Sequence, residues 1–202
     1  MESENLLPPL FLDSNVIVGH QLSPYHRISE PSDNIFQGKH PLWWSDKVRF
    51  ECYGHGKYHG VCHTQCRAFI REILRIKYAI DKQTFSKEQL LIWLDLSLQS
   101  YRNNYNIKKA YILQRLTLHT RETDYPAITN RIKDLISEAH IERDDSDIEI
   151  WLDAHDLAVT RDIKDLIFVS DNSTHVTKAA HIICDCTKIN KIQELKNYCT
   201  QH

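Results

Sequence analysis

Runs of consecutive apolar residues, separated by polar stretches, predict a set of short β-strands along this chain. Strands buried on both faces carry apolar residues at successive positions, whereas half-exposed strands alternate between apolar and polar. The run at 165–169, Asp-Leu-Ile-Phe-Val, is the clearest example. Further strands are expected at 10–13, continuing through 16–18 to a turn at Gly19, at 41–44, and at 180–184.

Apolar residues three and four positions apart predict helices between these strands. A helical face runs through 62–80, and the Ser-Lys-Glu-Gln sequence at 86–89 is typical of a capped start for a helix that continues to 98. Strands that alternate with helices indicate a parallel sheet covered on both faces. Further helices are expected at 107–119, 126–140, 148–160 and 191–198, with an irregular loop at 22–40 and a turn between two helices at 101–109.

The chain length predicts one domain that carries an elaboration. With 202 residues the chain can bury a sizeable core, and we expect a single domain over 1–202 with a Cys/His-rich segment at 52–66 and a mainly helical elaboration at about 67–147. No apolar run is long enough to cross a bilayer, and the first residues lack the basic and apolar regions of a secretion signal. The expectation is a cytoplasmic protein without membrane contact.

The net charge of the chain limits the kinds of nucleic-acid-binding protein that it could be. A formal net charge of −2 counts against tight binding through bulk phosphate contacts, although it leaves room for a nuclease whose acids are clustered. The segment 101–109 mixes cations with tyrosines, a combination that can hold a single strand, but a solvated turn is the simpler interpretation.

Four acidic motifs, far apart in the sequence, carry most of the functional information. Asp13 and Asp171 each close an apolar run, while Glu51 and Asp153 lie on the inner turns of predicted helices. Apolar flanks would carry these acids toward the interior, where an unpaired charge is costly. Acids gathered in one place repel each other unless a cation binds between them, and oxygen-only ligation suits Mg²⁺ or Mn²⁺.

In these motifs the sequence resembles the PIN-domain family of metal-dependent ribonucleases. The family's first strand ends in Asp-x-Asn, here Asp13 and Asn15, and its second acid lies in Ser-x-x-Val-x-x-Glu, here ending at Glu51. Its third acid opens a helix turn, here Asp153, and its last motif closes a strand with the sequence Val-Thr-Asp-Asn, here Val-Ser-Asp-Asn with Asp171 as the acid. All four motifs occur in the family's order.

The resemblance implies a fold, an activity and a set of roles. The fold is a PIN-like three-layer α/β sandwich with a central parallel sheet and a helical insertion. The activity is endoribonucleolytic hydrolysis of RNA, with one or two Mg²⁺ or Mn²⁺ ions held by the four acids. Asn15 and Ser170 would orient ligands or phosphate through hydrogen bonds.

Two positions and one interval depart from the family pattern. Asp156 stands where the family is usually apolar, so either this residue or Asp153 could face the metal. Asn172 competes with Asp171 for the last ligand position. The interval between Glu51 and Asp153 is far longer than the family needs, so the resemblance covers the two ends of the chain better than the middle.

A cluster of cysteines and histidines follows the second acid. Cys62 and Cys66 are four residues apart and would share a helix face, and a glycine-rich loop before them carries Cys52, His55 and His59. Two ligands from each part would make a closed structural Zn²⁺ site. The alternative is a buried stripe of ordinary packing residues.

Other functions remain open beside the ribonuclease. The main alternative is a non-catalytic PIN-fold protein that binds RNA or acts as a scaffold, with zinc as structural support. A nucleotide-binding protein is less favoured because none of the five glycines forms a phosphate-binding loop after the first strand. A cysteine-nucleophile enzyme would require a depressed thiol pKa. A second copy of the chain or another protein stays open as a partner.

Overall fold

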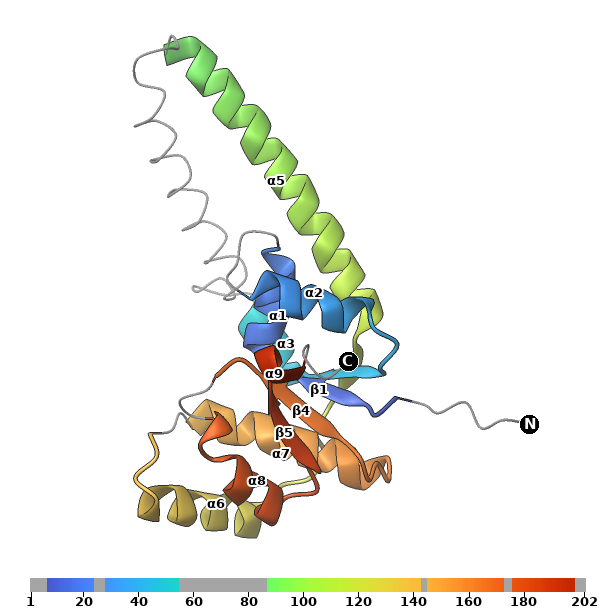
Figure 1. Ribbon diagram of the computed structural model, residues 1–202, viewed down its shortest axis with the longest axis vertical. Helices are drawn as coiled ribbons and strands as arrows, with labels where there is room; N and C mark the ends of the chain where they lie inside the picture. Colours follow the sequence, from blue (N-terminus) through green and yellow to red (C-terminus); the bar gives the residue numbers. More distant parts are fainter. Residues whose placement is uncertain (1–6, 24–27, 55–86, 143–144, 173–175, 199–202) are drawn as a thin grey trace, which may run out of the picture.

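The computed structural model describes residues 7–23, 28–54, 87–142, 145–172 and 176–198 (Figure 1). Its centre is a five-stranded sheet in the order β3-β2-β1-β4-β5, in which every neighbouring pair is parallel. The parallel α/β architecture predicted from the sequence is confirmed. The strands are β1 (Leu10–Leu12), β2 (Leu42–Ser45), β3 (Thr117–His119), β4 (Ile167–Ser170) and β5 (Lys191–Glu194).

Helices cover both faces of the sheet, as parallel strands require (Figure 1). On one side lie α1 (Ser14–Gln21), α2 (Ser29–Gln37) and α3 (Asp46–Tyr53), with the short α9 (Leu195–Tyr198) against α2. On the other lie α6 (Pro126–Glu138), α7 (Asp145–Thr160) and α8 (Ala180–Cys186). The three layers enclose one core, in which all of β1 and nearly all of β4 are inaccessible to solvent.

The first strand ends earlier than predicted. Residues 16–18 belong to α1 and do not extend the strand, because Asp13 caps the helix by accepting a hydrogen bond from the Ser14 amide. Three successive β-branched residues favour a strand by propensity. Packing overrides this preference here, since α1 is buried almost all round and gains from apolar residues on every side.

The predicted loop at 22–40 contains α2, which packs closely on α1. Gly19 lies within α1 and not at a turn. A Cβ added there would lie 2.4 Å from the Ser32 hydroxyl and 2.7 Å from a side-chain carbon of Ile28. The missing side chain of Gly19 is therefore what lets the two helices approach.

The predicted pair of helices around a turn at 101–109 is a single helix, α5 (Lys87–Arg115), of 29 residues, and residues 117–119, predicted as the end of the second helix, form strand β3. No glycine or proline interrupts this stretch, so its polar middle section continues the helix. Figure 1 shows α5 extending well beyond the sandwich. Its C-terminal end is fixed to the body, because Arg115 donates hydrogen bonds to the Gly38 and His40 carbonyls at 2.8 Å each.

The strand predicted at 180–184 is a helix, and the helix predicted at 191–198 is confirmed only over α9, at 195–198. Residues 180–184 form α8 and not a strand, and residues 191–194 form strand β5 where a helix was predicted. The helical spacing was present in Ala179, Ile182 and Ile183, which are the buried residues of this segment. In β5, pairing with β4 outweighs the polar composition of the segment.

Other expectations at this level are confirmed or lie outside the described residues. Strand β2 and helices α6 and α7 fall close to their predicted ranges. The predicted helix at 62–80 lies outside the described residues. Among the helices that the structure describes, none combines the length and apolar character needed to cross a membrane.

Candidate active site

The carboxyl ends of the five strands lie along one edge of the sheet, because all pairings are parallel. Continuing the register of β1 by one residue places Asp13 beside Ser170 of β4 and beside Ser45 of β2. Ser45 in turn pairs with His119, the last residue of β3. Polar residues thus form a row across this edge, which is where ligands of parallel α/β sheets gather.

Asp13 is buried and receives hydrogen bonds from neutral donors. One carboxylate oxygen accepts a hydrogen bond from the Ser14 backbone amide at 2.6 Å. The other accepts from the Ser170 hydroxyl at 2.6 Å and from the Asn15 side-chain amide at 3.0 Å. Burial raises the pKa of Asp13, and the hydrogen bonds from Ser170, Ser14 and Asn15 oppose that rise without cancelling it.

The last motif packs directly onto the first through Asn15 and Ser170. The Asn15 side chain donates to the Ser170 hydroxyl at 3.1 Å and accepts from the Asp171 backbone amide at 3.0 Å. The Ser170 hydroxyl also accepts from the Asn172 amide at 3.0 Å. Asn15 and Ser170 therefore hold Asp13 and the turn that carries Asp171 through these hydrogen bonds.

Glu51 reaches the same group from α3. Burial raises the pKa of Glu51, a hydrogen bond from Ser14 lowers it, and repulsion from Asp13 raises it further. Ser14 therefore stands between the two acids and hydrogen-bonds to both. The charge of Asp13 thus disfavours the ionised form of Glu51, and a pair of neighbouring carboxylates favours the binding of a cation.

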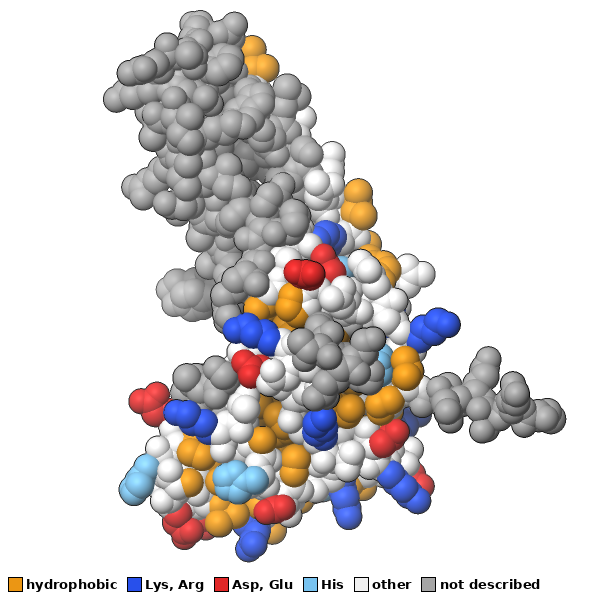
Figure 2. Space-filling view, in the orientation of Figure 1, with side chains coloured by type: hydrophobic (Ala, Val, Ile, Leu, Met, Phe, Trp, Pro, Cys, Tyr) orange, Lys and Arg blue, Asp and Glu red, His pale blue; other side chains and the backbone are white. Residues whose placement is uncertain are grey.

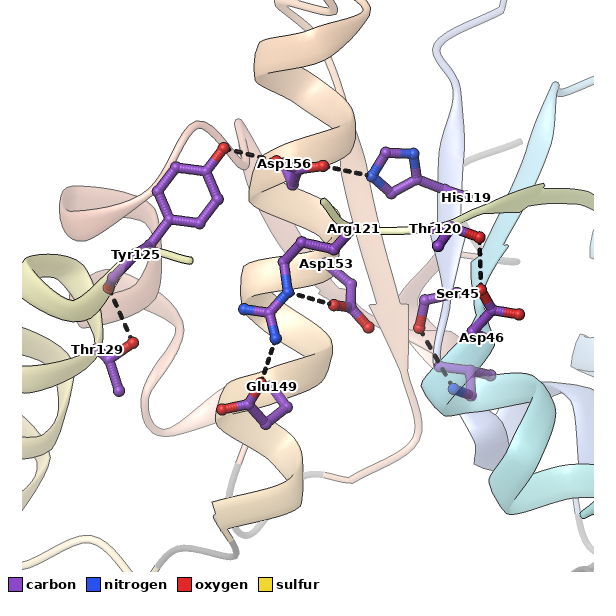
Figure 3. Close-up of polar contacts among 11 residues, drawn as sticks. Ser45, Asp46, His119, Thr120, Arg121, Tyr125, Thr129, Glu149, Asp153 and Asp156 are labelled. Atoms are coloured by element: carbon purple, nitrogen blue, oxygen red, sulfur yellow. Dashed lines mark hydrogen bonds and ion pairs between the residues drawn. The ribbon is translucent and has the colours of Figure 1, made fainter. Parts of the chain in front are cut away.

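Asp153 lies at the same edge but is already balanced by a cation. On α7 its side chain is 8% exposed, and the Arg121 Nε atom lies 3.0 Å from one of its oxygens (Figure 3). Burial raises the pKa of Asp153, while a hydrogen bond from Ser45 and the charge of Arg121 lower it. A second ion pair joins Arg121 to Glu149, one helical turn earlier on α7.

Asp156, weighed from the sequence as an alternative to Asp153, has both oxygens engaged in another network. Its carboxylate meets the His119 Nε2 atom at 2.9 Å and accepts from the Tyr125 hydroxyl at 2.6 Å. The residue is 1% exposed. Asp156 thus joins α7 to the end of β3 through His119 and to the following segment through Tyr125. Asp153 is the one of the two acids that faces Ser45 and the central edge (Figure 3).

The donors at the Asp13 edge fit a hard divalent cation in their chemistry. They are carboxylate, amide and hydroxyl oxygens, the ligand types that Mg²⁺ and Mn²⁺ prefer. Asp13 and Glu51 are coupled, whereas Asp153 is engaged with Arg121. In the described ranges, no three side chains of His, Cys, Asp or Glu stand in a metal-binding arrangement.

The predicted zinc ligands His55, His59, Cys62 and Cys66 lie outside the described residues. Cys52 is described, and it is fully buried in the core, with its sulfur 3.8 Å from the Ser14 carbonyl oxygen. Cys52, the first residue of the Cys/His-rich segment, therefore contacts Ser14, which hydrogen-bonds to Asp13.

Several residues of this edge were not identified from the sequence. Glu149 could have been noticed, because it lies four residues before Asp153 on one helix and so shares its face. Arg121 and His119 gave no such indication, since only the position of β3 next to β2 brings them to Asp153 and Asp156.

Comparison with protein-family models found no matching family, and comparison with curated proteins found no matching relative.

Proposed function

We propose that this chain is a metal-dependent endoribonuclease that hydrolyses RNA phosphodiester bonds at the carboxyl edge of its parallel sheet. The observation that carries the proposal is the pair formed by Asp13 and Glu51. Asp13 is buried, held by neutral donors, and electrostatically coupled to Glu51. A site of this kind becomes more stable when a divalent cation balances the carboxylates.

Metal binding and orientation would fall to different residues. Asp13, Glu51, Asp153 and Asp171 would hold one or two Mg²⁺ or Mn²⁺ ions. Bound at such a site, these ions lower the pKa of water and stabilise charge on phosphate oxygens. Asn15 and Ser170 fix the orientation of Asp13 through hydrogen bonds of 3.0 and 2.6 Å, so the principal ligand needs no rearrangement before it binds an ion.

RNA would be held mainly by groups close to the proposed metal site. Lysine and arginine side chains are spaced around the visible face of the body and are interspersed with acidic ones (Figure 2). With a formal net charge of −2, attraction of the strand would depend on groups near the site and weaken moderately with salt.

The test is cleavage of end-labelled RNA by the full chain. Unstructured and structured RNA, and DNA of the same sequence, are incubated with Mn²⁺, Mg²⁺ or EDTA. We expect internal cleavage of RNA with Mn²⁺ or Mg²⁺ and none with EDTA. Absence of cleavage by a protein that is folded and saturated with Mn²⁺ would contradict the proposal.

A second candidate, a non-catalytic RNA-binding or scaffold protein, is favoured by one observation. The Arg121–Asp153 ion pair, with its nitrogen and oxygen atoms 3.0 Å apart, already balances one of the four acids, as expected where an acid has lost its metal. The same experiment separates the two candidates, because retention of RNA without cleavage in Mn²⁺ would support the second.

A further inference from the structure

We infer that Arg121 sets the affinity of the proposed site for its divalent cation, because its guanidinium group occupies the position beside Asp153 that a metal ion would otherwise take. The inference rests on the proposed function and adds to it a residue that none of the four acidic motifs contains. Arg121 acts through Asp153 and is therefore a positioning residue.

The guanidinium group lies between an inner and an outer acid on one face of α7. Its Nε atom is 3.0 Å from the buried oxygen of Asp153, whose side chain is 8% exposed. An Nη atom pairs with Glu149, whose side chain is 44% exposed. The Arg121 side chain itself is 17% exposed, so the group sits at the boundary between the protein interior and solvent.

Side-chain hydrogen bonds hold residues before and after Arg121, so we expect replacement of Arg121 by a metal ion to involve mainly movement of the Arg121 side chain. Before it, the Thr120 hydroxyl donates to Asp46 of α3 at 2.5 Å. After it, the Tyr125 hydroxyl donates to Asp156 of α7 at 2.6 Å. Figure 3 shows the Arg121 side chain extending from this fastened segment toward α7.

Arg121 and a divalent metal ion compete for the Asp153 carboxylate because both are positively charged. The Arg121 Nε atom lies 3.0 Å from an Asp153 oxygen, so a divalent cation bound to that carboxylate would face the positive charge of the guanidinium group at close range. The attraction between Arg121 and Asp153 is lost when Arg121 leaves. Glu149 gives the departing guanidinium a second partner nearer to solvent, because the ion pair with Glu149 already exists. Arg121 therefore stabilises the metal-free protein and weakens metal binding, and it can move outward without losing every partner.

The first measurement is Mn²⁺ affinity by titration calorimetry of the full chain. We expect Arg121→Gln to bind Mn²⁺ about tenfold more tightly than wild type. Arg121→Lys keeps a cation and should stay close to wild type. Arg131→Gln, which alters an exposed arginine on α6, is the matched control and should not change the affinity. In EDTA, Arg121→Gln should melt about 4 °C below wild type, and saturating Mn²⁺ should remove the difference.

The second measurement uses the wild-type protein and so does not depend on the folding of a variant. The side-chain Nε–H resonance of Arg121, assigned by its absence in Arg121→Lys, is followed during titration with diamagnetic Mg²⁺. We expect it to move toward the position of a solvent-exposed arginine as the site fills.

The outcomes separate the inference from the proposed function. Equal or weaker Mn²⁺ affinity in Arg121→Gln, or an unmoved Arg121 resonance in Mg²⁺-saturated protein, overturns the inference and leaves the ribonuclease standing. Absence of Mn²⁺ and Mg²⁺ binding by the wild type and by Arg121→Gln overturns both.

Discussion

Asp13 and Asp153 lie at the same edge of one sheet, but a cation contacts Asp153, whereas the hydrogen bonds of Asp13 come from neutral donors. Neutral donors surround Asp13, namely the Ser14 backbone amide, the Asn15 side-chain amide and the Ser170 hydroxyl. A guanidinium cation, Arg121, contacts Asp153 at 3.0 Å. Burial raises the pKa of both acids, and a serine hydrogen bond, from Ser170 or from Ser45, is the strongest effect that lowers it. The difference between the two acids is therefore the cation beside Asp153.

The comparison indicates which half of the site is ready for a metal ion. Asp13 and Glu51 repel each other, and a bound cation would relieve that repulsion without displacing a cationic partner of the kind that contacts Asp153. At Asp153 a metal ion has to replace Arg121. We therefore expect the Asp13 half to supply most of the affinity and the Asp153 half to regulate it.

The largest expected effect follows removal of the negative charge of Asp13. Asp13→Asn should lower the rate of RNA cleavage by at least ~10³-fold, because a metal ligand that stabilises transition-state charge contributes several kcal/mol. Asparagine is also a good helix N-cap, so α1 should remain folded. Cleavage kinetics and circular dichroism measure the two expectations.

Asp165→Asn is the matched control for that change. Asp165 is exposed and lies just before β4, at the opposite edge of the sheet from Asp13. The same chemical change there should leave cleavage at the wild-type rate. Wild-type cleavage by Asp13→Asn would remove the metal mechanism in this form.

A second prediction distinguishes the two acids of α7 that are three residues apart. Asp153→Asn should lower the rate of cleavage by ~10²-fold. Asp156→Asn should keep the rate within about threefold and instead lower the free energy of unfolding by about 1–3 kcal/mol, because it disturbs the contacts with His119 and Tyr125. Chemical denaturation and cleavage kinetics test both. The reverse pattern would make Asp156 the ligand.

Local sequence patterns were sufficient to predict the central part of the fold. The apolar runs of β1, β2 and β4 carried strong local information because central parallel strands are buried on both faces. The two edge strands of the sheet carried little information of this kind. Strands β3 and β5 are mainly polar and only partly buried. They are strands because a neighbouring strand supplies hydrogen bonds, which a local pattern does not encode.

The same difference between central and edge strands decided which residues of the site could be predicted. Asp13, Asn15 and Ser170 were predicted together from two motifs, and the structure joins them by direct hydrogen bonds. Arg121 could not be predicted, because it follows β3, a strand that sequence analysis missed. Its contact with Asp153 depends on the pairing of β3 with β2, and no spacing in the sequence reports that pairing.

A third prediction uses pH to compare wild type and Asp13→Asn in the absence of metal. The raised pKa of Asp13 means that the native protein holds this proton to higher pH than the unfolded chain does. Stability is therefore lost as pH rises from the ordinary Asp range through the raised pKa, because the unfolded chain releases its proton first. The cost of the new amide does not depend on pH, so the stability of Asp13→Asn relative to wild type should increase with pH.

Urea denaturation in EDTA across acidic to neutral pH measures this difference. Asp165→Asn again serves as the control and should show a pH-independent difference from wild type. Addition of Mn²⁺ to the wild type should oppose the loss of stability at neutral pH, because a cation favours the ionised carboxylates. A flat difference between Asp13→Asn and wild type would show that Asp13 titrates alike in the folded and unfolded chains.

The smallest expected effect concerns the support of the Asp153 half. Tyr125→Phe removes the hydroxyl that donates to Asp156 at 2.6 Å but keeps the edge contact of the ring with His155. We expect a loss of about 1 kcal/mol in the free energy of unfolding, since hydrogen bonds to charged groups contribute more than neutral ones. Tyr111→Phe is the matched control, because its hydroxyl donates to the neutral Phe36 carbonyl at 3.1 Å, and it should cost about 0.5 kcal/mol. Paired urea denaturation curves decide between them, and a larger loss in Tyr111→Phe would show that Asp156 holds its place through His119 alone.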